Sequence, residues 1–201
     1  PQQLRSPPRG ERAHCRRCRG VVKAVLRKGD ETDCHRSHLT GLRVTLTPAD
    51  LSIEISGEGE VVSLGLTDFG HPVRAKSAED RFDFLIRGNI EAVIRAVSEV
   101  SGLSRNVLWS NAGNLFEGIA RGYAVDNDCP RAGVADALAL LELPQMADGS
   151  RNPLFRPILY PESDGHPERL RRVCCIRYLI DGLDYCKTCP CPGRHCSSGK
   201  N

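Results

Sequence analysis

Four cysteines near the carboxyl end constrain this chain more than any other feature of its sequence. Cys174 and Cys175 are adjacent, and Cys186 and Cys189 follow after ten intervening residues at CxxC spacing. A CxxC pair on a turn directs two thiolates at one metal ion, whereas successive residues of a regular strand point to opposite faces. The adjacent cysteines can therefore both act as ligands only if the chain leaves strand geometry there.

The distribution of the ten cysteines favours metal binding or redox chemistry over a disulfide framework. Six lie between positions 174 and 196, three lie near the start at Cys15, Cys18 and Cys34, and Cys129 is isolated. No charged-then-apolar leader is recognisable, and no apolar run approaches the ~18 residues of a membrane span. Clustered cysteines without an export signal are typical of a reducing compartment, so we expect a cytoplasmic protein.

The adjacent pair bears on the kind of metal centre. Four thiolates around one Zn²⁺ normally come from two CxxC-like knuckles, which a CC pair matches poorly. A [2Fe–2S] cluster distributes its four ligands over two irons and needs sulfurs that lie further apart. The spacing therefore favours a [2Fe–2S] cluster over zinc.

The same residues carry a family resemblance. The array CC-x10-C-x2-C, preceded by two arginines and followed by a proline, resembles the C-terminal signature of FhuF-like siderophore-iron reductases. Residues 106–111 (NVLWSN) resemble the Leu-Trp-Gly-Asn element that this family carries on a helix upstream of its cysteines, with Ser110 in place of glycine. The resemblance covers residues 88–190.

This resemblance implies that Cys174, Cys175, Cys186 and Cys189 ligate a [2Fe–2S] cluster and that no other catalytic residue is needed. The implied reaction is a one-electron reduction of Fe(III) in a ferric siderophore to Fe(II), which hard oxygen donors hold far more weakly, for intracellular iron release. An external donor such as a ferredoxin or a flavin reductase would supply the electron. No nucleic acid is expected as a partner, and transient association with a membrane surface stays open.

Residues beside the two motifs have open roles. Arg171, Arg172 and Arg177 either stabilise the more negative reduced cluster and attract anionic chelates, or are solvated loop charges. Trp109, the only tryptophan, is either a core residue or a ring that faces the chelate. Cys191 and Cys196, beside His195, form an alternative ligand pair, a thiol couple or part of a tail.

Two other functions stay open. The first is a zinc-stabilised interaction module whose basic N-terminus contacts nucleic acid or a protein partner. Cys15, Cys18 and Cys34, followed by His35 and His38, have a spacing compatible with a Cys3His zinc site. The second is a thiol–disulfide redox protein that uses CKTC or CRRC, although the βαβ pattern of thioredoxin-type proteins is missing.

The whole sequence predicts an α+β fold in which a small antiparallel β-meander precedes a helical segment and a C-terminal cysteine-rich iron–sulfur loop. We expect a basic, poorly ordered segment (1–40), an α+β domain (41–170), the [2Fe–2S]-binding motif (171–190) and a tail (191–201).

Local patterns place the elements of this fold. Alternating β-branched residues predict strands at 42–47, 51–56 and 60–67. Apolar residues at three- and four-residue steps predict helices from Ala78 to Gly102, from the N-cap Ser104 to Gly122, and between Pro130 and Pro144. A long loop is expected at 144–168, then a short strand at 171–180 before a turn at Asp181-Gly182.

Overall fold

The structure is a computed structural model that describes residues 42–43, 47–58, 61–66, 71–72, 74–125, 131–163 and 165–191. Several predictions from the sequence fall outside these residues. They concern the basic segment 1–40 with Cys15, Cys18 and Cys34, the isolated Cys129, and the His195–Cys196 pair.

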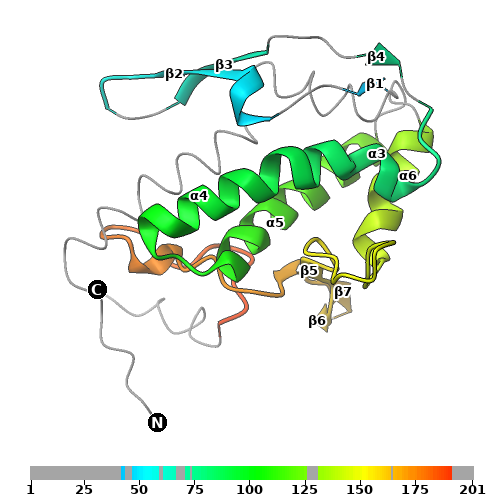
Figure 1. The fold of residues 1–201 in the computed structure, drawn as a ribbon. Helices are drawn as coiled ribbons and strands as arrows, with labels where there is room; N and C mark the ends of the chain where they lie inside the picture. Colours follow the sequence, from blue (N-terminus) through cyan, green and yellow to red (C-terminus); the bar gives the residue numbers. More distant parts are fainter. Residues whose placement is uncertain are drawn as a thin grey trace.

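A long helical run forms one side of the core (Figure 1). It consists of α3 (Ala78–Asp83), a π-helical stretch η2 (Phe84–Ile90) and α4 (Glu91–Ser101). The run ends at Gly102, whose φ of 67° is the left-handed conformation that glycine adopts most readily at a helix C-cap. The predicted first helix and its end at Gly102 are confirmed.

The chain then reverses into α5 (Arg105–Ala124), which lies antiparallel to α4. The hydroxyl of Ser104 accepts a hydrogen bond from the amide of Asn106 at 3.3 Å and caps this helix, as predicted. The helix continues two residues past Gly122, where the sequence predicts its end. The third predicted helix is α6 (Arg131–Glu142).

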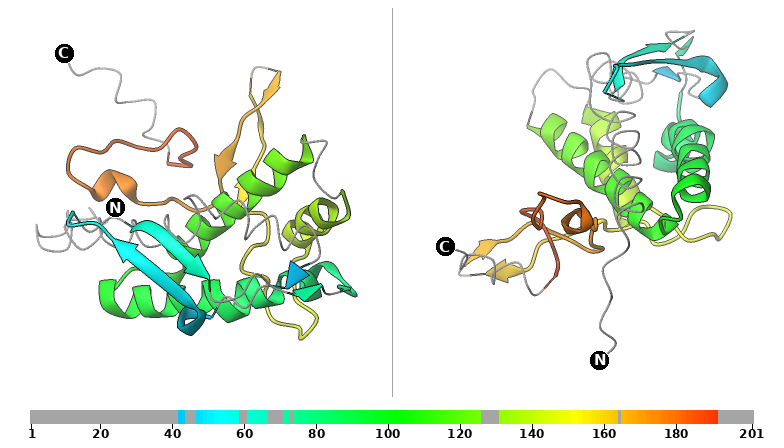
Figure 2. Two further views of the ribbon diagram at one scale, coloured as in Figure 1. Left: turned by 90° about the horizontal axis from the view of Figure 1, so that it is seen from above. Right: turned by 90° about the vertical axis from the view of Figure 1, so that its left-hand side faces the viewer.

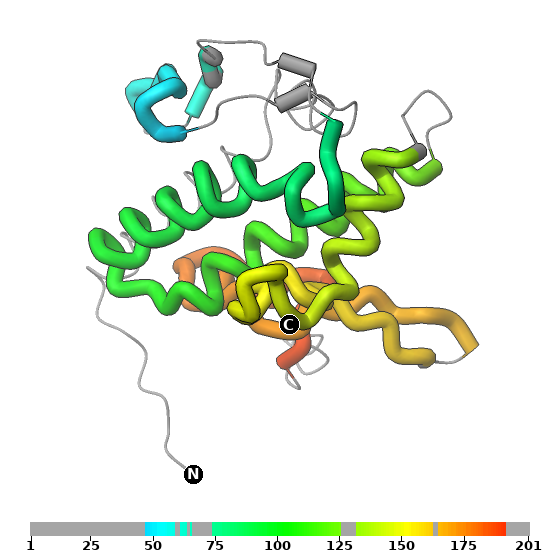
Figure 3. Tube along the Cα trace, turned by 45° about the vertical axis from the view of Figure 1, so that its right-hand side comes forward, coloured from blue at the N-terminus to red at the C-terminus, as the bar shows by residue number. Residues whose placement is uncertain are grey.

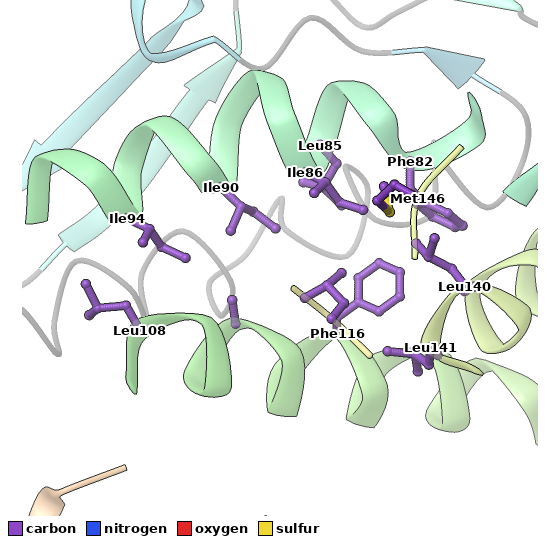
Figure 4. Close-up of a cluster of buried hydrophobic side chains, with 14 of the residues drawn as sticks. Phe82, Leu85, Ile86, Ile90, Ile94, Leu108, Phe116, Leu140, Leu141 and Met146 are labelled. Atoms are coloured by element: carbon purple, nitrogen blue, oxygen red, sulfur yellow. The ribbon is translucent and has the colours of Figure 1, made fainter. Parts of the chain in front are cut away.

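The core fills the space between these helices (Figure 4). Phe82, Ile86, Ile90 and Ile94 recur at four-residue steps, and each is at most 3% exposed. They face α5, on which the ring of Phe116 meets that of Phe82 edge-on with 5.2 Å between centroids. Burial of such a continuous apolar face is the main stabilising contribution to the helical layer. The α5 and α6 residues of this core are Leu108, Ala112, Phe116, Ala120, Val134, Ala137, Leu140 and Leu141.

Small antiparallel sheets complete the α+β class, which is confirmed. Strand β2 (Leu51–Ile55) pairs with β3 (Val61–Leu66), and Leu51 packs against the helical core. Strand β1 (Leu42–Arg43) pairs with β4 (His71–Pro72), so the first predicted strand joins β4 rather than its sequence neighbour. The β2–β3 ribbon lies over α4, on the side of the helices away from the C-terminal segment (Figure 2).

The predicted long loop at 144–168 is wrong in its second half, which forms short hairpins (Figure 3). Strand β5 (Ile158–Leu159) pairs with β8 (Leu170–Arg171), and β6 (Glu162–Ser163) pairs with β7 (His166–Pro167). The predicted strand at 171–180 is also wrong, because the chain leaves strand geometry after Arg171. Ladders of two residues carry no detectable periodicity, which explains why the sequence did not predict the hairpins.

The first half of that segment is irregular but fixed by one buried side chain. Asn152 is fully buried, and its Nδ2 donates to the carbonyl oxygens of Leu140 at 2.7 Å and Leu143 at 2.8 Å. Its Oδ1 accepts from the amide of Leu154 at 2.9 Å. The carbonyl of Leu140 also accepts from the amide of Leu143, so the Asn152 amide adds to the hydrogen bonds at the C-terminal end of α6 and directs the chain toward β5.

Candidate metal centre

The four cysteines of the array lie on a loop that closes on itself. The amide of Arg171 donates to the carbonyl of Thr188 at 2.8 Å, which joins the start of the loop to its end. The 3-10 helix η3 (Arg177–Leu179) and a turn at Gly182, with φ of 75°, lie between them. The predicted turn at this glycine is confirmed. A further turn, in which the amide of Cys189 donates to the carbonyl of Cys186 at 3.0 Å, presents the CxxC pair.

The closed loop arranges the sulfurs in two pairs. The Sγ atoms of Cys174 and Cys189 are 3.9 Å apart, and those of Cys175 and Cys186 are 3.7 Å apart. Each pair thus combines one adjacent cysteine with one cysteine of the CxxC turn. The adjacent cysteines lie outside any strand, and Ile176 after them has a left-handed φ of 52°. This local geometry lets neighbouring side chains serve different pairs.

Burial differs within the array. Cys175 and Cys189 are 6% and 1% exposed, whereas Cys174 and Cys186 are half-buried. Burial, together with the neighbouring sulfurs of Cys191 and Cys189, raises the pKa of the Cys174 thiol to about 12. The sulfurs of Cys174 and Cys189 lie close enough to repel each other as thiolates, so a cation bound by this pair is needed to favour their charged form.

A fifth cysteine lies beside the array. The Sγ atoms of Cys174, Cys189 and Cys191 all lie within 4.8 Å of one another. The amide of Cys191 also points at the Sγ of Cys189, at 3.5 Å. The sequence left the role of Cys191 open, and the structure places it at one end of the array.

Helix α5 anchors the start of the loop through the 106–111 element. The buried hydroxyl of Ser110 donates to the carbonyl of Val173 at 2.8 Å, directly before Cys174. The Nη1 of Arg171 donates to Oδ1 of Asn111 at 2.7 Å. Trp109 between them packs against the hydrophobic core, which agrees with the core interpretation of this residue. The element thus holds the backbone that carries the first two cysteines.

The three arginines beside the cysteines have different surroundings. Arg171 is fixed by Asn111, while the guanidinium of Arg172 lies 5.6 Å from the ring centroid of Phe155. Burial and the positive charge of Arg151 lower the pKa of Arg172. The Nε atoms of Arg171 and Arg177 are buried and have no hydrogen-bond partner among the residues that the structure describes.

Two tyrosines in the loop were missed by sequence reasoning. The rings of Tyr178 and Tyr185 stack with 4.7 Å between centroids and an interplanar angle of 31°. Burial raises the pKa of Tyr178, and the neighbouring Cys174, Cys191, Tyr185 and Cys189 raise it further. The signal available in the sequence was the presence of two tyrosines inside the ten-residue spacer. Their stacking supports the spacer from within.

A buried carboxylate that the sequence did not reveal supports the loop from α5. Glu117 is 3% exposed and accepts hydrogen bonds from Tyr160, Arg169 and Arg121. Burial alone would raise the pKa of Glu117, but these three donors outweigh it and lower the pKa. Because Arg169 also donates to Oδ1 of Asn114 at 3.0 Å, the network ties α5 to the hairpin that leads into the cysteine loop.

Comparison with known proteins identifies the family. The family model described as "Ferric iron reductase FhuF-like transporter" matches residues 41–190. The chain belongs to this FhuF-like family. The match confirms the resemblance inferred from the sequence and supports a role related to ferric iron reduction. A search among curated proteins finds no match to the chain. In the described residues, no helix is long and apolar enough to cross a bilayer.

Proposed function

We propose that this FhuF-like protein is a cytoplasmic oxidoreductase that reduces Fe(III) in ferric siderophores to Fe(II). Its cofactor is a [2Fe–2S] cluster held by Cys174, Cys175, Cys186 and Cys189. The observation that carries the proposal is the arrangement of these four sulfurs in two close pairs. An external donor, such as a ferredoxin or a flavin reductase, supplies the electrons.

The spacing within each pair fits two thiolates on one metal. A tetrahedral metal–thiolate site with bonds of about 2.3 Å separates two sulfurs by roughly 3.8 Å. The measured separations of 3.9 Å and 3.7 Å bracket this value. Two such pairs offer two ligands to each of two irons, which is the ligand distribution of a [2Fe–2S] cluster.

The arrangement of the two pairs relative to each other argues against a single zinc ion. One tetrahedral ion would bring all four sulfurs within roughly 3.8 Å of one another. In the described part of the chain, the only three cysteine sulfurs mutually within 4.8 Å are those of Cys174, Cys189 and Cys191. No three of the four proposed ligands meet that limit, so the array is wider than a mononuclear site. This width supports the cluster over the zinc-stabilised module.

Backbone amides around the sulfurs donate hydrogen bonds that tune the reduction potential of a bound cluster. A bound [2Fe–2S] cluster accepts and donates one electron at a time. The amide of Ile176 donates to Sγ of Cys174 at 3.3 Å, and that of Cys191 points at Sγ of Cys189. Hydrogen bonds to ligand sulfurs favour the more negative reduced state and so raise the reduction potential.

A positively charged surface near the loop suits an anionic chelate. Arg151 and Arg172 lie close enough for Arg151 to lower the pKa of Arg172. In the described residues, neither forms an ion pair with a carboxylate. Two cations without a counter-ion attract an anion, and the ring of Phe155 beside Arg172 adds an apolar contact.

Iron and acid-labile sulfide analysis of anaerobically purified protein tests the proposal. We expect two irons and two sulfides per chain, visible absorption, and bleaching by dithionite that is reversed when a ferric siderophore is added. The Cys186→Ser variant should lose this absorption. A colourless protein with one zinc per chain would support the interaction module instead, and a metal-free protein with a redox-active disulfide would support the thiol–disulfide alternative.

A further inference from the structure

We infer that Cys191 is a reserve ligand of this metal centre, able to replace Cys174 or Cys189 on the metal ion that those two cysteines share. The inference rests on the proposed function, because it concerns the same centre. It goes further by assigning a fifth sulfur to one defined end of the array.

The positions of the sulfurs carry this inference. Cys174 and Cys189 form one of the two pairs, and Cys191 lies within 4.8 Å of both. Two thiolates on one tetrahedral ion are separated by roughly 3.8 Å, so the sulfur of Cys191 has to come at most about 1 Å closer to that of the remaining cysteine. A side-chain rotation covers such a distance without moving the backbone.

The position of Cys191 in the chain keeps it beside this pair. It is half-buried, and its own backbone amide already points at Sγ of Cys189. Only Pro190 separates it from Cys189, so the two side chains leave the backbone close together. Cys191 therefore lies close enough to replace the sulfur of Cys174 or Cys189 when either one is damaged or substituted.

The other pair has no such reserve within the described residues. Neither Cys175 nor Cys186 belongs to a group of three cysteine sulfurs within 4.8 Å. The two ends of the array should therefore respond differently to loss of one sulfur. Cys174 and Cys186 form a matched comparison, since both are half-buried and each belongs to a different pair.

Alanine variants of the reconstituted full chain test the inference, because alanine offers no ligand atom. C174A and C189A should keep at least half of the wild-type iron and sulfide, with shifted absorption and electron paramagnetic resonance spectra. C174A/C191A, C189A/C191A and C186A should keep less than a tenth. C191A alone should match the wild type in iron, sulfide and spectrum.

Three results would overturn the inference. If C174A and C189A bind as little iron and sulfide as C186A, Cys191 cannot act as a ligand. If the double variants bind as much iron as the single variants, the fifth ligand lies elsewhere. If C191A alone binds no iron, Cys191 is an obligatory ligand rather than a reserve. Wild-type protein without any cluster would instead contradict the proposed function, which keeps the two failures distinguishable.

A second measurement follows Cys191 directly. Alkylation by iodoacetamide, read by mass spectrometry, should modify Cys191 in the iron-loaded wild type and spare it in iron-loaded C174A. Cys189 is nearly fully buried, so C189A can fail to fold; the half-buried Cys174 then carries the test. Equal alkylation of Cys191 in both proteins would contradict the inference.

Discussion

The hydroxyl of Ser110 on α5 donates a hydrogen bond to the carbonyl of Val173 at 2.8 Å, across 63 residues of sequence. Val173 directly precedes the first cysteine of the array. In the family element that 106–111 resembles, glycine occupies this position, and glycine has no hydroxyl. The serine of this chain therefore adds a tie between α5 and the cysteine loop.

Removal of this tie should weaken the loop. The S110A variant leaves the partly buried carbonyl of Val173 without its side-chain donor, which costs about 1–2 kcal/mol. We expect urea unfolding to show a free energy of unfolding lower by that amount, and a chelator to remove iron from the variant faster. The S52A variant is the control, because Ser52 is exposed on β2 and should change neither quantity. An unchanged rate of iron loss in S110A would contradict this role.

The bond between Arg171 and Asn111 should contribute a measurable coupling energy. A hydrogen bond to a charged group contributes about 1.5–3 kcal/mol, and this one has a length of 2.7 Å. A double-mutant cycle of N111A, R171A and the double variant isolates the pairwise contribution. We expect a coupling near the lower value, since both residues are only half-buried. Additive effects of the two single variants would show that the bond contributes nothing.

Close packing of α5 against the chain before β5 gives Gly113 a steric role. A Cβ at this position would lie 2.7 Å from Cβ of Pro157, and the next residues lead to the hairpin that carries the cysteine loop. The G113A variant should therefore lose about 1–3 kcal/mol of unfolding free energy. Thermal and urea unfolding measure this loss.

Gly122 on the same helix provides the control, because nothing lies within 4 Å of its added Cβ. Alanine is the better helix former by about 0.5–1 kcal/mol, so G122A should be more stable than the wild type. A loss of unfolding free energy in G113A and a gain in G122A would confirm that contact with Pro157, rather than helix propensity, determines the effect of G113A. A stabilised G113A would contradict it.

The helical layer could be predicted from the sequence because its physics is local. Phe82, Ile86, Ile90 and Ile94 repeat with the period of a helix, and Gly102 marks the end of that helix. The cysteine array could be predicted because its spacing is a property of the chain itself. The family assignment followed from the same spacing and was confirmed by the comparison.

The contacts that hold the cysteine loop in place could not be predicted, because the residues that make them are distant in sequence. Glu117 bonds Tyr160 and Arg169, which lie 43 and 52 residues away, and no local pattern marks such a network. The approach of Cys191 to Cys174 likewise depends on how the loop closes. Sequence periodicity reports which face of an element is buried, whereas these contacts depend on the packing of elements.

The Glu117 network predicts a specific dependence of stability on pH. A carboxyl whose pKa is lower in the folded state contributes stability that is present above its unfolded pKa, about 4.3, and lost as the pH falls through the folded pKa. The E117Q variant should lose about 3 kcal/mol at pH 7, because Arg169 and Arg121 lose their buried partner. Urea unfolding should show the difference from the wild type narrowing as the pH falls below about 4.

An exposed ion pair of the same chemistry is the control for E117Q. Glu142 receives a hydrogen bond from Nε of Arg156 at 2.7 Å, but both side chains are more than half exposed, at 60% and 57%. Exposed pairs contribute about 0–1 kcal/mol, so E142Q should change stability little at any pH. If the free energy of unfolding differs between E117Q and the wild type by the same amount from pH 7 to pH 3, the lowered pKa of Glu117 is contradicted.

Arg172, which lies over the ring of Phe155 and forms no ion pair with a carboxylate of the described residues, predicts how anionic chelates bind. If Arg172 attracts a negatively charged ferric chelate, R172A should raise its KM about fivefold, as expected from losing roughly 1 kcal/mol of electrostatic attraction. Added salt should reduce the difference between the variant and the wild type, because screening weakens the attraction. R95A removes an exposed charge from α4 as a control, and its KM should stay near the wild-type value. An equal rise in KM for an uncharged ferric chelate would instead assign Arg172 to packing against Phe155, because a charge effect requires a charged ligand.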